Sequence, residues 1–385
     1  MEARRQKLPI LDAFRFLAAC MVVLVHYEII FGEFLVYGAF ATTAVSWFFV
    51  VSGFILSYTY PILSGFSDYK RFYLHRIIRI YPVYLLAVVV SSAFVIIGYK
   101  MHGVDFFAQV HRPFELSYDL PPELSDRFFR GAVLRHLTFT QSIGGIETLK
   151  LLFNGPLWSL VLEMYFYLVF PLLLWILKPV RSAGQIGALF VVGILLQLLL
   201  IQAWLPEAEQ YNVMNLNVPV YTNPFIRVIE FIFGMLLYKA FVLNNWLEAP
   251  PRLRLGPVLS SIILYVAVIA LSSRYTPYQY HAFFLSVPFV TLMIFRLLEL
   301  RWYPDESKVR FCTLLGGLSY VLYCFHWPFM EMLQYSDLLP ALPTFLHIIL
   351  LMALLLLLSY IVYRWIESPL RRLLYRLLVG ETRRL

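Results

Sequence analysis

The chain has 385 residues, of which 61% are hydrophobic, 17% are aromatic and 14% are charged. Soluble domains carry about 25% charged residues, so this composition excludes a water-soluble globule and indicates an integral membrane protein. The net charge of +8 does not indicate nucleic-acid binding, because the basic residues stand between apolar segments rather than in one patch.

Ten apolar segments are long enough to cross a bilayer as helices, which takes about 20 residues each. We expect these crossings at residues 10–31, 38–60, 81–99, 157–177, 184–204, 223–243, 256–272, 280–297, 313–333 and 344–365. The expected fold class is therefore all-α: one polytopic bundle over residues 1–385. We expect its largest loop at about 100–156, on the extracytoplasmic side, and no appended soluble domain. Lysine and arginine recur in alternate connecting segments and at both ends, which predicts that both termini are cytoplasmic.

The first expected crossing contains Arg15 and His26, eleven positions apart. On a helix this spacing is about 1100°, or about 20° from whole turns, so both side chains share one face about 16 Å apart along the axis. Ionisable residues within crossings usually face the bundle interior or a cavity, which makes both functional candidates. Asp12 lies one turn before Arg15, and a structural pair of these two residues is the alternative for Arg15.

Two motifs follow at the second and third crossings. Gly53, in "WFFVVSGFIL", allows another helix or a ligand to approach closely. The basic stretch "DYKRFYLHRIIRIYPVY" places Arg76 and Arg79 three positions apart on one helix face, with Lys70 and Arg71 on the approach. Guanidinium groups suit phosphates, which predicts binding of a phosphorylated cytoplasmic substrate. Contact with lipid head groups is the alternative.

The long loop contains "SDRFFRGAVLRHLTFTQ", which predicts a short helix capped by Ser125 or Asp126. One side of this helix is lined by Phe128, Phe129, Val133 and Leu137. We expect the helix to lie at the outer surface, where a packed lid without chemistry is the alternative. The histidines of this loop are expected at the surface: His102, His111 and His136.

Glu163, in "NGPLWSLVLEMYFY", is expected in the outer part of its crossing, at a depth close to that of His26. A neighbouring glutamate orients a histidine and stabilises its charged form, which is typical of a general base and its partner. Ser159 lies one turn before Glu163. In the sixth crossing, Arg227 and Glu230 are expected to form a structural ion pair, with acceptor binding as the alternative.

His326, in "GGLSYVLYCFHWPFM", is expected in the outer half of the ninth crossing. Pro328 removes a backbone hydrogen bond there, which favours a kink that exposes polar backbone to a cavity. Tyr320 and Tyr323 precede His326, and a core histidine bonded to a tyrosine is the alternative.

Taken in order, these motifs resemble those of the membrane acyltransferase 3 family, polytopic enzymes that O-acylate surface sugars and some small molecules. The resemblance covers almost the whole chain, through "LDAFRFLAACMVVLVH", "FFVVSGFIL", "RIIRIYP", "NGPLWSLVLEMYFY", "GLSYVLYCFHWP" and "ESPLRR". Phe16 and Ala44 depart from the family pattern, because each stands where glycine is common. Both changes bear on helix packing and leave the polar residues intact.

The resemblance implies a multi-pass protein of the bacterial cytoplasmic (inner) membrane that uses acyl-CoA, most often acetyl-CoA, as co-substrate. No permanently bound cofactor and no metal are expected. The acceptor would be a hydroxyl of a carbohydrate or glycolipid, such as an exopolysaccharide, at the extracytoplasmic side. The implied catalytic residues are His26, Glu163, Arg15 and His326, and the implied donor-binding residues are Arg76, Arg79, Lys70 and Arg71. Candidates for contacts with the oxyanion or the acceptor are Ser159, Tyr167, Tyr323, Asn154 and Trp158.

Two alternatives stay open at this point. Within the enzyme reading, direct transfer to the acceptor and a route through an acylated His26 fit equally well. The rival function is a transporter or flippase of acyl groups or lipid-linked sugars. Transporters tend to show inverted repeats and paired broken helices, and the sequence shows neither feature.

Overall fold

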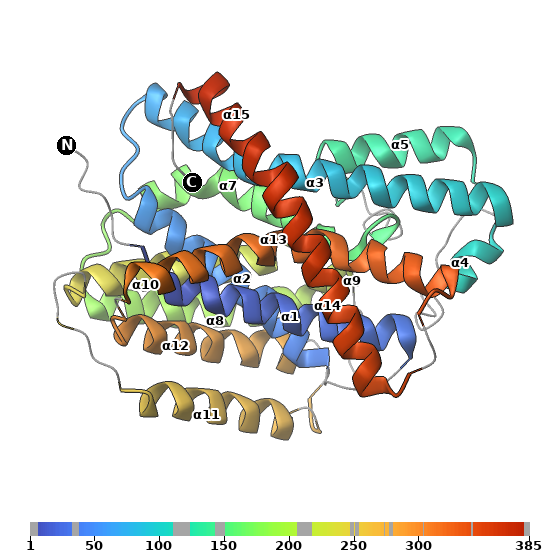
Figure 1. Ribbon diagram of the computed structural model, residues 1–385. Coiled ribbons are helices and arrows are strands. Elements are labelled where there is room, and N and C mark those ends of the chain that lie inside the picture. The colour runs from blue at the N-terminus through green and yellow to red at the C-terminus, as the bar shows by residue number, and fades with distance from the viewer. Residues whose placement is uncertain are drawn as a thin grey trace. The chain divides into compact units, whose positions relative to one another are not determined.

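The computed structural model describes residues 7–32, 38–110, 124–142, 151–205, 218–246, 250, 254–272, 274–276, 280–302, 304–339 and 342–380. Within these ranges every regular element is a helix (Figure 1), which confirms the all-α class for the described part of the chain. The longer helices are α1 (Pro9–Phe31), α2 (Gly38–Thr59), α3 (Phe66–His102), α7 (Trp158–Ile176), α8 (Ala183–Trp204), α10 (Pro224–Leu243), α11 (Gly256–Ser272), α12 (Ser286–Glu299), α13 (Glu306–Ser336) and α14 (Thr344–Val362). The shorter ones are α4 (Asp105–Val110), α5 (Asp126–Leu137), η1 (Gly155–Leu157), α9 (Val218–Tyr221), η3 (Tyr280–Leu285), η4 (Tyr363–Glu367) and α15 (Ser368–Val379).

Six helical stretches in the described residues are long and apolar enough to cross a membrane. They are Pro9–Phe31, Phe66–His102, Gly155–Ile176, Ala183–Trp204, Glu306–Ser336 and Thr344–Val379. Two shorter apolar helices, Thr43–Thr59 and Gly256–Ser272, add to them. The helices therefore support a multi-pass membrane protein. Each of the ten expected ranges falls on a helix, whereas the number of crossings and their orientation stay predictions.

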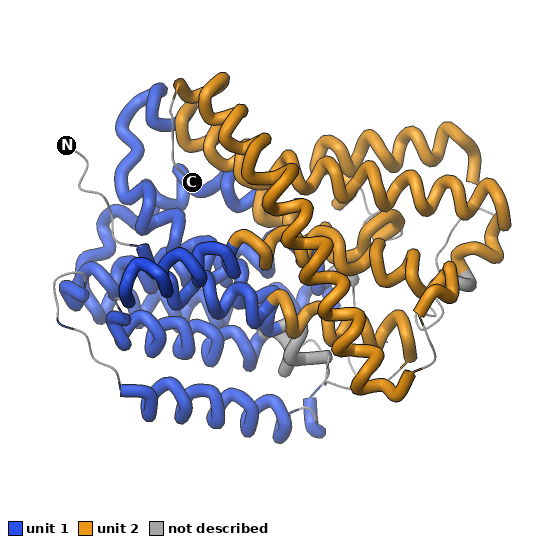
Figure 2. The backbone as a smooth tube through the Cα atoms, viewed as in Figure 1, with its two compact units in different colours: residues 1–18, 38–69, 165–316 blue, residues 19–37, 70–164, 317–385 orange. Residues whose placement is uncertain are grey.

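The chain divides into two compact units (Figure 2). Unit 1 comprises residues 1–18, 38–69 and 165–316, and unit 2 comprises residues 19–37, 70–164 and 317–385.

The centre of unit 1 is a close crossing of α2 and α10. A Cβ atom on Gly53 would overlap the carbonyl of Phe231, and one on Gly234 would overlap the carbonyl of Val50. The two helices therefore meet backbone to backbone, which only small residues permit. Gly53 was expected to allow the close approach of a helix or a ligand, and the structure identifies that neighbour as α10.

In unit 2 the second half of α1 runs parallel to α13. His26 meets His326. Four residues further along α1 and eight further along α13, the Gln334 side chain donates to the Ile30 carbonyl at 2.6 Å. The Tyr27 hydroxyl lies 2.6 Å from Nδ1 of His347, and this contact joins α14 to α1.

The expected short helix of the long loop is present as α5, and Ser125 is its cap. The Ser125 hydroxyl accepts a hydrogen bond from the Phe128 N–H at 3.2 Å. Lys100 pairs with Asp126 at 3.1 Å at the start of α5.

At the other end of α5, the Tyr84 hydroxyl donates to the His136 carbonyl at 2.8 Å and the Tyr81 hydroxyl donates to the Leu137 carbonyl at 3.2 Å. The helix therefore lies antiparallel along α3, back to the first residue of the crossing expected at 81–99. Its aromatic side packs against α3 and the segment around Phe153, as in the packed alternative. Its place at the outer surface stays a prediction.

The expectation of a surface histidine is wrong for His136, whereas His102 is exposed as expected. His136 is 0% exposed, its ring lies 4.9 Å from that of Phe153, and Nδ1 donates to the Ala132 carbonyl at 2.8 Å. Burial of the ring lowers the pKa of His136 to about 4. His111 lies outside the described residues.

Candidate active site

The centre of the site is a pair of histidines from α1 and α13. Nδ1 of His26 lies 2.7 Å from Nε2 of His326. The ring planes are within 15° of each other and the centroids are 5.0 Å apart. The nearly parallel planes let an N–H of one ring point at the lone pair of the other. Both residues were predicted as catalytic from the sequence, and the structure brings them into direct contact.

Hydrogen bonding fixes which nitrogen of each ring carries the proton. Nδ1 of His326 lies 3.0 Å from the Leu322 carbonyl, which can accept but not donate. Nδ1 of His326 is therefore protonated, and Nε2 of the neutral ring holds a lone pair. His26 must then donate to it through its own Nδ1–H, which leaves the lone pair of His26 on Nε2. The contacts thus assign His26 as the basic member of the pair.

The surroundings of the two rings differ. His326 is 0% exposed, whereas His26 is only partly buried. The ring of Trp327 meets the ring of His26 edge-on, with centroids 5.0 Å apart and planes at 88°. The buried histidine and the indole therefore hold the ring of His26 in place.

Ser159 and Tyr323 form a second polar contact close to the pair. Their hydroxyls are 2.6 Å apart, and both reach the Pro156 carbonyl, Ser159 at 3.1 Å and Tyr323 at 3.0 Å. This arrangement can use both hydroxyl hydrogens within the cluster. In this conformation the two side chains brace the turn of η1, so their role towards an oxyanion stays a prediction.

Asn154, just before η1, is 0% exposed and donates through Nδ2 to the Cys324 carbonyl at 2.9 Å. Its Oδ1 atom is buried and makes no hydrogen bond to any described residue. Asn154 therefore offers a buried hydrogen-bond acceptor beside Cys324, which lies two residues before His326 on α13. Trp158, at the start of α7, is also buried, at 4% exposure.

Glu163, expected at a depth close to that of His26, follows Ser159 along α7. Ser159 is the α7 residue that reaches Tyr323, and Glu163 is one turn, about 6 Å, beyond it. Its charge lies within electrostatic range of Tyr320 and Cys324. Since α7 and α13 run antiparallel here, Glu163 is displaced from the level of the histidine pair towards Tyr320. The ring of His26 is oriented by His326, and an orienting role for Glu163 stays a prediction.

The predicted donor-binding residues lie on the first half of α3. Arg76 and Arg79 are half-buried, whereas Lys70 and Arg71 are exposed. Directly after Arg79, the Ile80 carbonyl accepts a hydrogen bond of 2.6 Å from the Tyr320 hydroxyl. The α13 helix that carries His326 is thereby fixed to the helix that carries the arginine pair.

Arg15 and Tyr167 belong to unit 1 and are described within that unit. Arg15 is half-buried and Tyr167 is 4% exposed. Their predicted catalytic and acceptor roles stay predictions.

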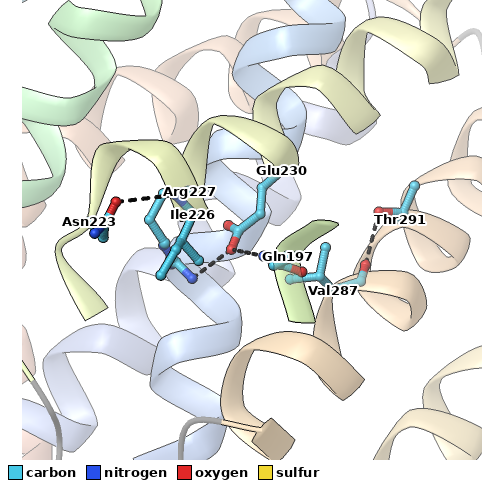
Figure 3. Close-up of polar contacts among 7 residues, drawn as sticks. All are labelled: Gln197, Asn223, Ile226, Arg227, Glu230, Val287 and Thr291. Carbon is cyan, nitrogen blue, oxygen red and sulfur yellow. Dashed lines mark hydrogen bonds and ion pairs between the residues drawn. The ribbon is translucent and has the colours of Figure 1, made fainter. Parts of the chain in front are cut away.

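Unit 1 contains the expected pair of Arg227 and Glu230 (Figure 3). Both side chains are fully buried, with Nη1 and Oε1 2.6 Å apart. The guanidinium lies 5.2 Å from the ring of Phe49 and 5.5 Å from that of Tyr221, and Gln197 donates to Glu230 at 3.4 Å. Aromatic faces and an amide stabilise the desolvated charges, which fits the structural role that we expected.

Two of these polar contacts were not expected from the sequence, although Glu367 and Arg371 belong to the motif "ESPLRR". Glu367 and Arg371 form a buried ion pair of 3.0 Å, and their spacing of four was a readable signal for a pair on one helix. Gln197 stands alone among apolar residues, so no periodic pattern marked it as a partner of Glu230.

Comparisons with known proteins identify the family of the chain. Residues 8–364 match the family model described as an acyltransferase domain. The O-acetyltransferase OatA of Staphylococcus aureus is 24% identical over 389 residues, which cover 95% of this chain and 57% of that protein. The peptidoglycan O-acetyltransferase OatA of Listeria monocytogenes is 24% identical over 403 residues, which cover 96% of this chain and 56% of that protein.

An uncharacterized protein of Haemophilus influenzae is 23% identical over 230 residues, which cover 59% of this chain and 87% of that protein. No solved structure matches the chain. The chain spans just over half the length of the Staphylococcus and Listeria proteins. Because the acyltransferase model covers nearly all of it, the chain belongs to the acyltransferase 3 family.

Proposed function

We propose that the chain is a membrane O-acyltransferase that moves an acyl group, most simply acetyl, from acyl-CoA to a hydroxyl of a cell-envelope sugar. The observation that carries this proposal is the chain of hydrogen bonds from the Leu322 carbonyl through His326 to His26. It ends on a ring nitrogen with a lone pair, on a partly accessible side chain. Family membership and the names of the two OatA relatives support the reaction class.

The roles of the two histidines in the reaction follow from which ring nitrogen of each carries the proton. Nε2 of His26 takes the proton of the acceptor hydroxyl as its oxygen attacks the thioester carbonyl. The resulting imidazolium is stabilised because its Nδ1–H donates to His326, whose own proton points at the Leu322 carbonyl. Collapse of the tetrahedral intermediate breaks the carbon–sulfur bond, and His26 returns the proton to the thiolate. The products are an O-acyl sugar and free CoA thiol.

In this proposal His326 has the position that a carboxylate holds in a serine hydrolase triad, but it is a neutral group. It orients His26 and fixes its tautomer. Because His326 is fully buried, water does not reach its ring. Solvent therefore cannot exchange the proton between its two nitrogens. His326 is thus a positioning residue, and His26 is the catalytic base.

The donor would enter beside Arg76 and Arg79, whose planar guanidinium groups suit the phosphates of CoA. The bond between Tyr320 and the Ile80 carbonyl keeps this end of α3 fixed to α13. For the acceptor, the name of the Listeria relative points to a peptidoglycan sugar. We propose a sugar hydroxyl of the envelope as the acceptor class.

The test is acyl transfer by purified protein in detergent, with acetyl-CoA and a sugar acceptor. It follows release of the CoA thiol and the mass of the acetylated sugar. We expect His26→Ala to abolish transfer and His326→Ala to lower kcat by about 10²–10⁴ with little change in KM. His102→Ala, which alters an exposed histidine of the same unit, should leave both constants unchanged. Full transfer by folded His26→Ala would overturn the proposal.

A further inference from the structure

The C-terminal helix α15 begins with a buried ion pair outside the histidine site. Nη1 of Arg371 lies 3.0 Å from Oε1 of Glu367, and the two side chains are 11% and 0% exposed. Glu367 closes η4, a single turn of π-helix, and such turns recur at functional sites. Burying both charges is costly, so the pair needs a reason beyond stability.

The helix α15 packs against the basic stretch of α3. The rings of Tyr375 and His75 lie 5.3 Å apart at 71°, which places one turn of α15 against the turn of α3 before Arg79. Tyr375 and Arg371 are the two buried residues of α15. They lie one turn apart, as do His75 and Arg79. The guanidinium of Arg79 consequently lies within electrostatic range of Arg371.

Two arginines, one on α3 and one on α15, therefore lie within electrostatic range of each other, and the Glu367 carboxylate pairs with only one of them. Nε of Arg371 and Oε2 of Glu367 are buried and make no hydrogen bond within the described residues. Among the same residues Arg79 makes no ion pair. An unpaired buried donor costs about 1–3 kcal/mol, and more when it is charged. A net positive charge beside an unpaired N–H donor favours binding of an anion, because the anion would balance the charge and accept the hydrogen bond.

We propose that Arg371 and Arg79 together form a phosphate-binding site, in which the Glu367 carboxylate holds the guanidinium of Arg371 in position. The site deepens the proposed function, on which its assignment to the acyl donor rests. Planar guanidinium groups bind phosphate oxygens through two parallel N–H donors, which a lysine cannot reproduce. Arg371 thereby joins the arginine pair of α3 as a third phosphate ligand that the basic stretch alone does not reveal.

The same chemistry has two possible sources, a phosphate of CoA or the head group of an anionic lipid. The neighbouring Arg372 supplies a matched control on the same helix. It is exposed and its Nε donates to the Ser368 carbonyl at 3.2 Å. It has the same charge one position further along α15, about 100° around the helix axis from Arg371.

The experiment measures CoA binding to the purified full chain in nanodiscs of neutral phosphatidylcholine. A second arm measures retention of phosphatidylglycerol by native mass spectrometry. We expect Arg371→Gln to weaken the binding of CoA, or the retention of phosphatidylglycerol, at least about tenfold. Arg372→Gln should stay within about twofold of the original chain in both arms. Arg371→Lys keeps the ion pair and the fold, and should still lose several-fold in the affected arm.

Each outcome decides a separate question. A loss confined to the CoA arm assigns the site to the donor, and a loss confined to the lipid arm assigns it to a head group. Wild-type affinity of Arg371→Gln in both arms, or equal losses for Arg372→Gln, overturns the phosphate site. Binding of CoA that depends on Arg371, without any acyl transfer, would instead overturn the proposed function and leave this site standing.

Discussion

Two buried arginine–glutamate pairs, one in each unit, differ in what surrounds them. Arg227 and Glu230 of unit 1 are 2.6 Å apart and both are 0% exposed. Arg371 and Glu367 of unit 2 are 3.0 Å apart and similarly enclosed. The first pair lies among aromatic rings and the amide of Gln197. The second faces a further guanidinium, that of Arg79.

This difference in surroundings distinguishes an ion pair that stabilises the fold from one that can bind a ligand. In unit 1 the charges of Arg227 and Glu230 balance, and the ring faces of Phe49 and Tyr221 replace part of the lost hydration of the guanidinium. In unit 2 the balance is positive, which favours an anionic ligand. Burial and geometry are alike in the two pairs, so neighbouring charge is what distinguishes them.

The largest expected effect concerns the stability of unit 1. Arg227→Ala leaves Glu230 buried without its cation, which should lower the free energy of unfolding by about 3–5 kcal/mol. Arg371→Ala should cost less, because it also removes the repulsion between Arg371 and Arg79. Thermal unfolding of the purified variants in one detergent measures both. Equal melting temperatures for the two variants would remove the distinction between the pairs.

A smaller effect should appear in unit 2 on acidification. Seven of the eight histidines lie in the residue ranges of unit 2, and burial lowers the pKa of His136 from 6.5 to about 4. Below pH 6.5 the imidazole of His136 binds a proton in the unfolded segment, whereas the buried ring of the folded protein stays neutral down to about pH 4. Stability therefore falls as the pH drops from 6.5 towards 4, by about 2 kcal/mol at pH 5.

Hydrogen exchange of the α5 amides at pH 7 and pH 5, corrected for intrinsic rates, measures this change. His136→Gln should lose most of the difference between the two pH values, and the amides of α10 in unit 1 should change less. Unaltered protection of α5 at pH 5 in the original chain would contradict the expectation.

An effect of similar size concerns the α2–α10 crossing. Gly234→Ala would place a methyl group against the backbone of Val50, which cannot yield as a side chain does, and should cost about 1–3 kcal/mol. The matched control is Gly187→Ala in α8, where nothing lies within 4 Å. That change should be neutral or stabilise by up to about 1 kcal/mol. Melting temperatures that move together would show that the crossing is looser than the structure indicates.

The sequence determined the helical elements because their signal is local. Runs of apolar residues set the positions of the helices, and Ser125 marked the start of α5 through its own hydroxyl. Spacing along one helix also placed Arg227 with Glu230, since residues three apart face the same way. His26 and His326 were chosen as candidates because an ionisable side chain within an apolar segment costs free energy.

The tertiary structure decided which of these residues meet. His26 and His326 are 300 positions apart, and no periodicity links them. It also decided that His136 is buried, because α5 turns back along α3, and that Arg371 faces Arg79 rather than solvent.

The physical reason is the same in each case. Patterns along the chain report which face of a helix avoids water. They do not report which other helix covers that face. The sequence thus determined a membrane bundle with costly polar residues in its interior, and the packing of α1, α3, α13 and α15 decided which of them act together.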